Sequence, residues 1–371
     1  MATATRTNKE LMTMQKAVIV TGGAGFIGCA LSAHLKQFGL PIVAVDNLHP
    51  QIHAESRRPD ALDPSAELYI GDVTEMQTWE QVLDRWHPSI VVHLAAETGT
   101  GQSLTEASRH AHVNVVGTTA MIDAFSARNL VPDHVLLASS RAVYGEGAWL
   151  DADGTTFYPP PRSHAVLARA QWDAVSPSAT GPAQPLPHRA DTVFPAPTSV
   201  YGGTKLAQEH ILAAWCGAMQ VPLSVFRLQN VYGPGQSPFN AYTGIITLFH
   251  RLARKGQALD IYEDGLIGRD FVYIDDVVAA LIAGLRSPPS SVRTLDVGSG
   301  VVTTIADAAR AIAAMHDAPA PVVCGKFRDG DVRWAVADAA PLAASLDVHA
   351  QVSFDEGARR VGQWLIERGY A

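Results

Sequence analysis

Residues 16–46 read KAVIVTGGAGFIGCALSAHLKQFGLPIVAVD, and this stretch decides the fold. Residues 17–20 form a short apolar run rich in β-branched side chains, which is typical of a buried parallel strand. A turn with three glycines follows, then a helix predicted over 26–38 and a second strand predicted over 41–45. This order predicts a strand–helix–strand unit of a parallel sheet.

The glycines Gly22, Gly25 and Gly28 each have a physical role in such a unit. They permit a tight turn, a close approach of the backbone to a pyrophosphate, and close packing of helix on strand. The unpaired N–H groups at the helix start would face the phosphates. Asp46 ends the second strand, where its carboxylate can bind the adenosine ribose hydroxyls and would repel a 2′-phosphate. The unit therefore favours NAD over NADP, although three glycines can also form a purely structural turn.

Composition and charge narrow the class of protein. With 371 residues, the chain can form one large α/β unit and a smaller lobe, and its net charge of -8 argues against a nucleic-acid surface. Three widely spaced cysteines without a CxxC pair favour reduced thiols, and no HExxH or other metal motif is evident. The polar N-terminus and a longest apolar stretch of only 277–285 predict a cytoplasmic protein with no membrane span.

Strands and helices alternate along the next part of the chain. Strands are predicted over 67–72 and 90–94, with an amphipathic helix over 76–86 between them, and this order predicts a doubly wound sheet. Asp72 and Val73 follow a strand at the edge where ligands bind in such sheets. We expect them on the adenine side of the cofactor, although Asp72 could instead cap the next helix.

The following two strand ends carry further candidate residues. Residues 93–101 (HLAAETGTG) are small where a chain would pass close to a cofactor. A long helix is predicted over 104–128, with Asn114 on a largely apolar face, where an amide usually has a specific partner. The strand predicted over 134–139 leads into Ser140, whose hydroxyl lies at the carboxyl end, where it can contact a substrate.

The alternating pattern breaks at 147–198, which is rich in proline. We predict a long irregular insertion with one helical turn near 166–172, either a functional loop or a passive excursion. Regular structure then resumes, with a helix at 199–216, a strand at 223–228, helices at 243–255 and 275–285, a strand at 293–297, and closing helices at 303–315 and 355–367.

Together these elements predict an α/β fold, a Rossmann-type doubly wound parallel sheet with a smaller C-terminal α/β lobe that binds the substrate. The predicted division is a flexible N-terminal tail at 1–15, an NAD-binding domain at 16–227 plus 272–297, and a substrate-binding lobe at 228–271 plus 298–371.

The stretch SVYGGTK places Tyr201 and Lys205 four residues apart, on one face of a helix. A phenol is a poor base at its free pKa of about 10, but a cation beside it favours the phenolate. Such a pair can move a proton at neutral pH. The same spacing occurs by chance in many helices, so its position after a dinucleotide unit is what favours a catalytic role.

With these residues, the chain resembles the extended short-chain dehydrogenase/reductase family, in particular its NAD-dependent nucleotide-sugar epimerases and dehydratases. The likeness covers nearly all of 16–364 and rests on TGGAGFIG, GDV, HLAAE, SSRAVYG, YGGTK, RLQNVYGPG, GRDFVYIDD and RDGDVRWAVAD. The resemblance implies that Tyr201 is the base, that Lys205 holds the nicotinamide ribose and tunes the base, and that Ser140 binds the reacting sugar hydroxyl.

The resemblance also implies that Asn230, Arg269 and Arg328 hold the diphosphate of a nucleotide sugar. Guanidinium groups suit that role because their paired donors match phosphate oxygens. The alternative for each arginine is an ordinary ion pair, with Asp270 or Asp329 as the partner. The expected cofactor contacts are Gly22, Gly25, Phe26, Ile27, Gly28, Asp46, Asn47, Asp72, Val73, Leu94, Ala95, Ala96, Asn114, Ser139, Tyr201 and Lys205, and the expected substrate contacts are Thr98, Ser140, Arg141, Asn230, Arg269 and Arg328.

The residues after Ser140 narrow the reaction. The 4,6-dehydratases of the family carry Asp-Glu there and the related decarboxylases an acid at the second place, whereas this chain has Arg141 and Ala142. Without a second acid–base group, elimination of water from the keto intermediate is difficult. This leaves 4-epimerisation, in which a hydride is removed, the 4-keto sugar turns and the hydride returns. Arg141 has either a role particular to this branch or a mere surface position.

The proline-rich insertion with AQWD, together with RLQNVYGPGQS and YTGI, is similar to the branch that interconverts dTDP-L-rhamnose and dTDP-6-deoxy-L-talose. The resemblance implies an isomerase with retained NAD, a dTDP-linked 6-deoxyhexose as substrate, and a homodimer formed through the helices near 104–128 and 199–216. The alternatives are a UDP-sugar 4-epimerase, an NAD-dependent ketosugar-nucleotide reductase or dehydrogenase, and a non-catalytic dinucleotide sensor. A sensor would not need Tyr201 and Lys205.

Overall fold

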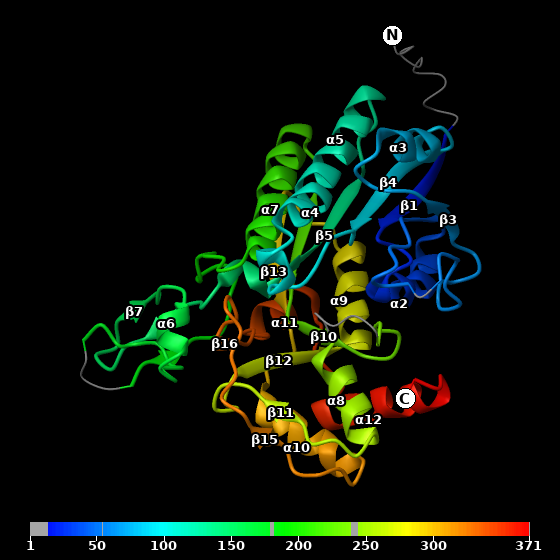
Figure 1. The fold of residues 1–371 in the computed structure, drawn as a ribbon. Helices are drawn as coiled ribbons and strands as arrows, with labels where there is room; N and C mark the ends of the chain where they lie inside the picture. Colours follow the sequence, from blue (N-terminus) through cyan, green and yellow to red (C-terminus); the bar gives the residue numbers. More distant parts are fainter. Residues whose placement is uncertain (1–13, 54, 179–181, 239–243, 371) are drawn as a thin grey trace.

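The computed structural model describes residues 14–53, 55–178, 182–238 and 244–370 (Figure 1). The predicted tail up to residue 13 and the first residue of the helix predicted over 243–255 lie outside these ranges. No helix within the ranges is long and apolar enough to cross a membrane.

A seven-stranded sheet forms the centre of the molecule (Figure 1). Its strand order is β13-β9-β5-β4-β1-β2-β3, and every neighbouring pair is parallel. The order reverses beside β1, and the carboxyl edge at such a reversal is where α/β sheets bind ligands. The predicted doubly wound sheet is therefore confirmed. Its strands are β1 (Gln15–Thr21), β2 (Ile42–Asp46), β3 (Glu67–Ile70), β4 (Trp86–His93), β5 (His134–Ser140), β9 (Leu223–Leu228) and β13 (Val292–Val297).

Helices cover both faces of this sheet (Figure 1). Successive residues of a strand point to opposite faces, so β1 buries Val18 and Val20 in one hydrophobic cluster and Ala17 and Ile19 in another. A strand that is buried on both faces is apolar throughout, which explains the continuous run at 17–20. The first cluster includes α2 (Phe26–Leu35) and α9 (Ile274–Arg286), and the second includes α3 (Met76–Leu83), α5 (Gly117–Ala127) and α7 (Val200–Met219).

The helical segment after β4 differs from the single helix predicted over 104–128. A 3₁₀ turn (Gln102–Leu104) comes first, and α4 (Ala107–Ala111) is joined to α5 by five residues of π-helix (His112–Val116). Single-turn π segments often place a functional side chain out of the α-helical register. The π segment here contains Asn114, which is fully buried.

The insertion is more regular than predicted. Ser163 Oγ accepts a hydrogen bond from Val166 N and caps the helical turn α6 (His164–Leu167), which begins two residues before the predicted position. Three two-residue strands also form a small antiparallel sheet in the order β7-β6-β8. Two residues carry too little pattern to be predicted as a strand. These strands are β6 (Trp149–Leu150), β7 (Thr156–Phe157) and β8 (Gln184–Pro185).

After β9 the chain forms a smaller lobe around the central strand β12, which pairs with β10, β14 and β16. Strands β11 and β15 pair separately. One hydrophobic cluster contains residues of both the large sheet and this lobe, so the core is continuous and the division into two domains stays a prediction. The lobe contains β10 (Asn230–Tyr232), β11 (Asp260–Ile261), β12 (Gly268–Tyr273), β14 (Val302–Thr304), β15 (Val322–Val323), β16 (Trp334–Ala335), α8 (Ile245–Arg254), α10 (Ile305–Met315), α11 (Ala340–Leu346) and α12 (Phe354–Glu367).

Candidate functional site

The glycine turn between β1 and α2 is built from backbone that leaves no room for side chains. Gly22 has φ +67°, and a Cβ there would lie 2.8 Å from Ala95 N at the end of β4. A Cβ on Gly28 would lie 2.6 Å from Gly22 O, and one on Gly25 would lie 3.2 Å from the same oxygen. No side chain of the described residues caps the start of α2, so this cradle fits a pyrophosphate.

Asp46 is fixed against the glycine turn. Its Oδ2 accepts a hydrogen bond from Ala24 N at 3.0 Å, and its Oδ1 accepts one from Leu48 N at 2.9 Å. His53 Nε2 lies 3.6 Å from the same Oδ1, a neighbour that the sequence did not indicate. The carboxylate is thereby held at the end of β2, at the edge of the sheet that faces the cradle.

Asp72 connects two strand ends rather than capping a helix. Its Oδ2 accepts a hydrogen bond from Asn47 Nδ2 at 2.9 Å, and its Oδ1 accepts from both the amide and the hydroxyl of Thr74. Burial alone would raise the pKa of Asp72, but these bonds together outweigh it and hold the pKa below its usual range. The N-cap residue of α3 is Glu75, so the capping alternative is wrong.

Tyr201 and Ser140 are brought together by the start of α7. Ser199 Oγ accepts a hydrogen bond from Gly202 N at 3.1 Å and caps the helix. A Cβ on Gly202 would lie 2.4 Å from Ala142 O, so only glycine lets the helix approach the loop after β5 this closely. Ser140 Oγ accepts a hydrogen bond from Ala142 N, and the Ser140 side chain lies close enough to the Tyr201 phenol to influence its pKa.

The charges around Tyr201 differ from the expectation. Burial raises the pKa of Tyr201, while the Ser140 side chain and the Arg141 guanidinium act to lower it. Burial lowers the pKa of Lys205 to about 7, and its Nζ donates to Gln208 Oε1 at 2.6 Å. Arg141 is thus a cation that acts on the phenol and that the sequence did not indicate, and the expected tuning of Tyr201 by Lys205 stays a prediction.

A buried polar network lies beneath Lys205. Gln208 Nε2 donates to Thr118 Oγ1 at 2.9 Å, and His93 shares hydrogen bonds with Thr118 Oγ1 and with Thr21 Oγ1. Burial, together with the Lys205 charge, lowers the pKa of His93 to about 3, so the imidazole is neutral. This network fixes the Gln208 amide and with it the Lys205 ammonium.

Asn114 has the specific partners that its buried position predicts, and they are protein groups. Its Oδ1 accepts a hydrogen bond from Glu97 N at 2.8 Å, and its Nδ2 donates to Glu97 O and to Thr204 Oγ1. Ser139 likewise donates to a protein group, the carboxylate of Glu209. The side chain of Asn114 therefore joins the end of β4 to α7, between Tyr201 and Lys205.

Among the expected substrate residues, Arg141, Asn230 and Arg269 lie close together, whereas Arg328 stands apart. Arg141 Nε donates to Asn230 Oδ1 at 2.8 Å, and burial and the positive charge of Arg269 both lower the pKa of Arg141. Arg269 is itself buried, and its Nη2 donates to Asp331 Oδ1 at 2.6 Å. Arg328 is exposed, with its guanidinium 5.2 Å from the centre of the Tyr262 ring.

The ion pairs considered for Arg269 with Asp270 and for Arg328 with Asp329 are wrong. Asp270 instead accepts hydrogen bonds from the backbone of Ser299, Gly300 and Ala337, and Asp329 lies 3.0 Å from His164. Thr98, another expected substrate residue, is partly buried, and its backbone oxygen lies beside His110. The ring of His110 lies 6.5 Å from that of Tyr201. The sequence did not indicate His110.

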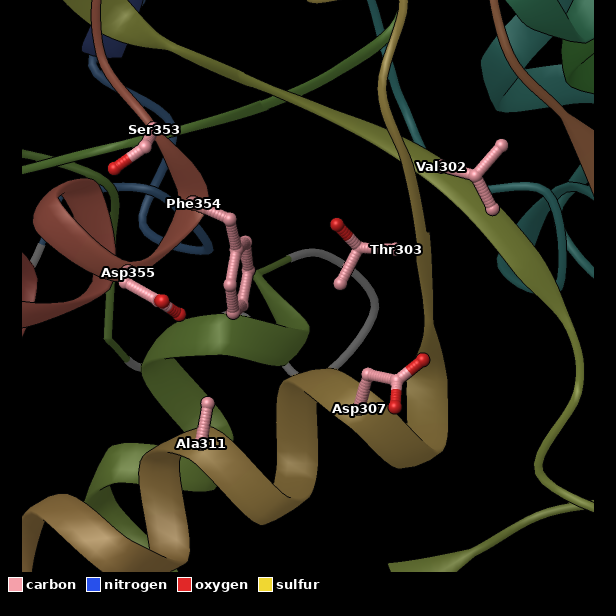
Figure 2. A pocket seen from close by; sticks show the side chains of 7 residues that line it. All are labelled: Val302, Thr303, Asp307, Ala311, Ser353, Phe354 and Asp355. Atoms are coloured by element: carbon pink, nitrogen blue, oxygen red, sulfur yellow. The ribbon is translucent and has the colours of Figure 1, made fainter.

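A cavity of about 250 Å³ lies in the smaller lobe (Figure 2). None of the expected site residues lines it, so this cavity is separate from the candidate site around Tyr201 and the glycine turn. Within the described ranges, no group of three or more His, Cys, Asp or Glu side chains is placed to hold a metal ion. The cavity is lined by Val302, Thr303, Asp307, Ala311, Ser353, Phe354 and Asp355.

Comparison with known families agrees with this geometry. Residues 18–171 and 168–298 match the model of the NAD dependent epimerase/dehydratase family. The chain belongs to this family. This match confirms the family that the sequence predicts, together with the Rossmann-type fold and the NAD cofactor.

Individual members of the epimerase/dehydratase family resemble the chain over almost its whole length. It is 54% identical over 352 residues to the dTDP-L-rhamnose 4-epimerase of Burkholderia thailandensis, with 95% of each chain covered. It is 27% identical to dTDP-glucose 4,6-dehydratase 1 of Escherichia coli, with 94% of this chain and 92% of that one covered.

Solved structures of the family share the fold. The UDP-glucose 4-epimerase of Thermus thermophilus, in complex with NAD, has a TM-score of 0.75 and 25% identity, and covers 96% of this chain and 100% of its own. The UDP-glucose 4-epimerase of Thermotoga maritima with UDP-glucose also has a TM-score of 0.75 and 25% identity, with 95% and 99% covered.

Proposed function

We propose that the protein is an NAD-dependent isomerase that interconverts dTDP-L-rhamnose and dTDP-6-deoxy-L-talose by epimerisation at C4. The observation that carries the proposal is that the Tyr201 phenol lies within reach of Ser140 and Arg141, at the sheet edge that carries the dinucleotide cradle, with Arg141 rather than an acid after the serine. The 54% identity to a dTDP-L-rhamnose 4-epimerase supports the choice of substrate.

In the proposed mechanism, Tyr201 moves the proton of the 4-hydroxyl group. Ser140 would orient that hydroxyl, because its side chain lies beside the phenol. Tyr201 accepts the proton as the C4 hydrogen leaves, and Arg141 favours the phenolate that must be present before the step. NAD, when bound in the cradle, would supply the hydride chemistry needed at C4. Tyr201 then returns its proton to the 4-oxygen.

The residues proposed to hold NAD surround the glycine cradle. The amides at the start of α2 would bind the pyrophosphate, and Asp46 would accept hydrogen bonds from the adenosine ribose. Asn47, Asp72 and Val73 belong to the adenine side. Lys205 would donate to the nicotinamide ribose, for which its Nζ has two further donors beyond the Gln208 bond.

Arg141 is the proposed main cation for the substrate. Asn230 fixes its Nε, and no partner for its two terminal nitrogens is found among the described residues. These nitrogens form a planar fork that suits phosphate oxygens or a pair of sugar hydroxyls. Both terminal nitrogens of Arg269 already donate to protein groups, Nη1 to Gly268 O and Nη2 to Asp331 Oδ1 and Val332 O, so this residue would contribute mainly charge. Arg328 would reach the diphosphate from its exposed loop.

Dehydration is disfavoured by the position of the nearby acid Glu146. Burial raises the pKa of Glu146, but its Oε1 accepts from Arg162 and its Oε2 from Arg333 N. A carboxylate held by these donors is not free to supply a proton to a leaving hydroxyl group. Epimerisation needs no such group.

Proton NMR tests the proposal directly. Purified protein incubated with dTDP-L-rhamnose and no added cofactor should produce the anomeric and H4 signals of a second 6-deoxysugar nucleotide. An unchanged spectrum from protein that contains NAD would contradict this substrate. Conversion of UDP-glucose instead would support the UDP-sugar 4-epimerase alternative.

The proposal includes a homodimer and a cytoplasmic location. The helices near 104–128 and 199–216 would form the dimer interface. Val116 and Met219 place exposed apolar side chains on these helices, which fits such a contact. Sedimentation of the purified protein would show a dimer, and a monomer at micromolar concentration would contradict it.

A further inference from the structure

Arg162 belongs to the insertion but binds segments that come before and after it. Its side chain is 6% exposed, and its Nε donates to Glu146 Oε1 at 3.2 Å. Its Nη1 donates to Glu263 Oε2 at 2.9 Å and to Trp172 O at 3.2 Å, and its Nη2 donates to Asp331 O at 2.9 Å. A planar guanidinium with four acceptors fixes the relative positions of four segments.

A second arginine pairs across the same boundary in the opposite direction. Arg333 belongs to the lobe, and its Nε donates to Asp173 of the insertion at 2.7 Å. Its Nη1 shares Glu263 Oε2 with Arg162, and its backbone N–H donates to Glu146 Oε2 at 3.0 Å. Insertion and lobe therefore each supply cations and anions to one network.

This network is continuous with the proposed substrate site. Arg162 holds the backbone oxygen of Asp331, and Asp331 Oδ1 holds Arg269 Nη2 at 2.6 Å. Arg269 and Asp331 lie close enough to Arg141 for their charges to change its pKa, which Arg269 lowers and Asp331 raises. A shift of Asp331 would therefore move the cations that face the substrate.

Two rings of the insertion, those of His164 and Trp172, also contact the segment that contains Phe327 and Arg328. The ring of His164 lies 5.1 Å from that of Phe327, and the ring of Trp172 lies 6.3 Å from it. His164 Nδ1 also lies 3.0 Å from Asp329 Oδ2. Arg328 lies between Phe327 and Asp329 in the sequence, so the insertion contacts both neighbours of this candidate diphosphate residue.

We infer that the insertion holds the residues of the substrate site in position and that Arg162 is a positioning residue for the nucleoside diphosphate. The inference rests on the proposed function, because it concerns the same site. The acceptors of Arg162 are Glu146, Trp172, Glu263 and Asp331, so it acts on the substrate through them. Its removal would leave Glu146 buried with fewer donors and would release Asp331, so diphosphate binding weakens while the chemical step remains.

The test compares Arg162→Met with the control Arg169→Met. Arg169 is an exposed arginine of the same insertion that bonds only Gln171 among the described residues. For Arg162→Met we expect the affinity for dTDP, measured by calorimetry, to fall at least about tenfold and KM for dTDP-L-rhamnose to rise equally, with kcat within about threefold. NAD content should not change. Arg169→Met should match the wild type.

A second variant covers the case in which Arg162→Met does not fold. His164→Ala combined with Trp172→Ala removes the ring contacts to Phe327 without leaving a buried charge, and should raise KM about threefold at unchanged kcat.

Two results would overturn the inference. One is a folded Arg162→Met variant that binds dTDP like the wild type, whatever its melting temperature, and the other is a loss confined to kcat. If Arg162→Met does not fold, an unchanged KM in the double variant would also overturn it. A wild type that leaves dTDP-L-rhamnose unchanged would contradict the proposed function instead, so the two failures are distinguishable.

Discussion

The cofactor side and the substrate side of the site are built from different kinds of contact. On the cofactor side, close backbone approaches within 22–28 and a bond from Ala24 N to Asp46 Oδ2 shape the cradle. On the substrate side, side chains pair across the chain, and Arg162 reaches Asp331 over a separation of 169 residues. Backbone atoms define the first region, and charged side chains define the second.

The difference indicates how the two regions respond to change. A turn in which a Cβ meets backbone atoms tolerates no side chain, so its sequence is restricted to glycine. A network of ion pairs depends on the geometry of several long side chains, so single substitutions can adjust it while the sheet persists. Substitutions in each region test this contrast, beginning with the residue where both regions meet.

Tyr201→Phe should give the largest effect. Without the phenol oxygen, no group takes the 4-hydroxyl proton, and activity should fall by about 10²–10⁴-fold. NAD content and the melting temperature should stay close to those of the wild type. Assay of the purified variant by NMR checks this, and normal turnover would contradict the mechanism.

Gly22→Ala should damage the cofactor side severely. The residue has φ +67°, and its Cβ would lie 2.8 Å from Ala95 N, so we expect NAD to be lost and stability to fall by about 2–4 kcal/mol. Gly39→Ala is the matched control, because Gly39 has φ +65° with no described atom within 4 Å of its Cβ. The control should cost about 1–2 kcal/mol and keep NAD. Equal NAD content in both variants would contradict the role of close approach.

Acid should destabilise both the cofactor side and the smaller lobe through buried histidines. Burial lowers the pKa of His93, on the cofactor side, to about 3 and that of His250, in the lobe, to about 4. Between pH 6.5 and 4 the unfolded chain therefore binds more protons than the native one, and stability falls as pH falls, by up to about 1.4 kcal/mol per pH unit for each histidine.

Denaturant unfolding at pH 7 and pH 5 measures this loss. His250→Gln removes one of the two groups, so its stability should change less between these pH values. A pH dependence as steep as that of the wild type would contradict the assignment of His250.

Asp173→Asn should have the smallest effect. Its side chain is 71% exposed, so its ion pair with Arg333 is screened by water and contributes less than about 1 kcal/mol. KM should change by less than about twofold. A loss as large as that expected for Arg162→Met would show that exposed and buried pairs matter equally, contrary to this account.

The sequence predicted the strand–helix–strand unit of the cofactor side because its signals are local. The glycine turn and Asp46 lie within one strand–helix–strand unit, and Tyr201 and Lys205 lie within the first turns of one helix. Each is readable from spacing over a few residues. The residues beneath Lys205 were missed, because the contact of Gln208 with Thr118 joins positions 90 residues apart.

The substrate side was less predictable for the same physical reason. Asp270 and Asp329 were considered because they adjoin Arg269 and Arg328 in the sequence, whereas the carboxylate on Arg269 is that of Asp331, 62 residues away. Such pairings depend on the packing of loops and have no periodic signal. The two-residue strands of the insertion are also too short to produce one.

The most direct measurement of the central claim is epimerisation of dTDP-L-rhamnose in D₂O. If Tyr201 moves only the hydroxyl proton and the C4 hydrogen returns to the same carbon, the product should retain protium at C4, visible as an H4 signal of full intensity by NMR. Deuterium at C4 would show that the hydrogen exchanges with solvent, and would contradict the account.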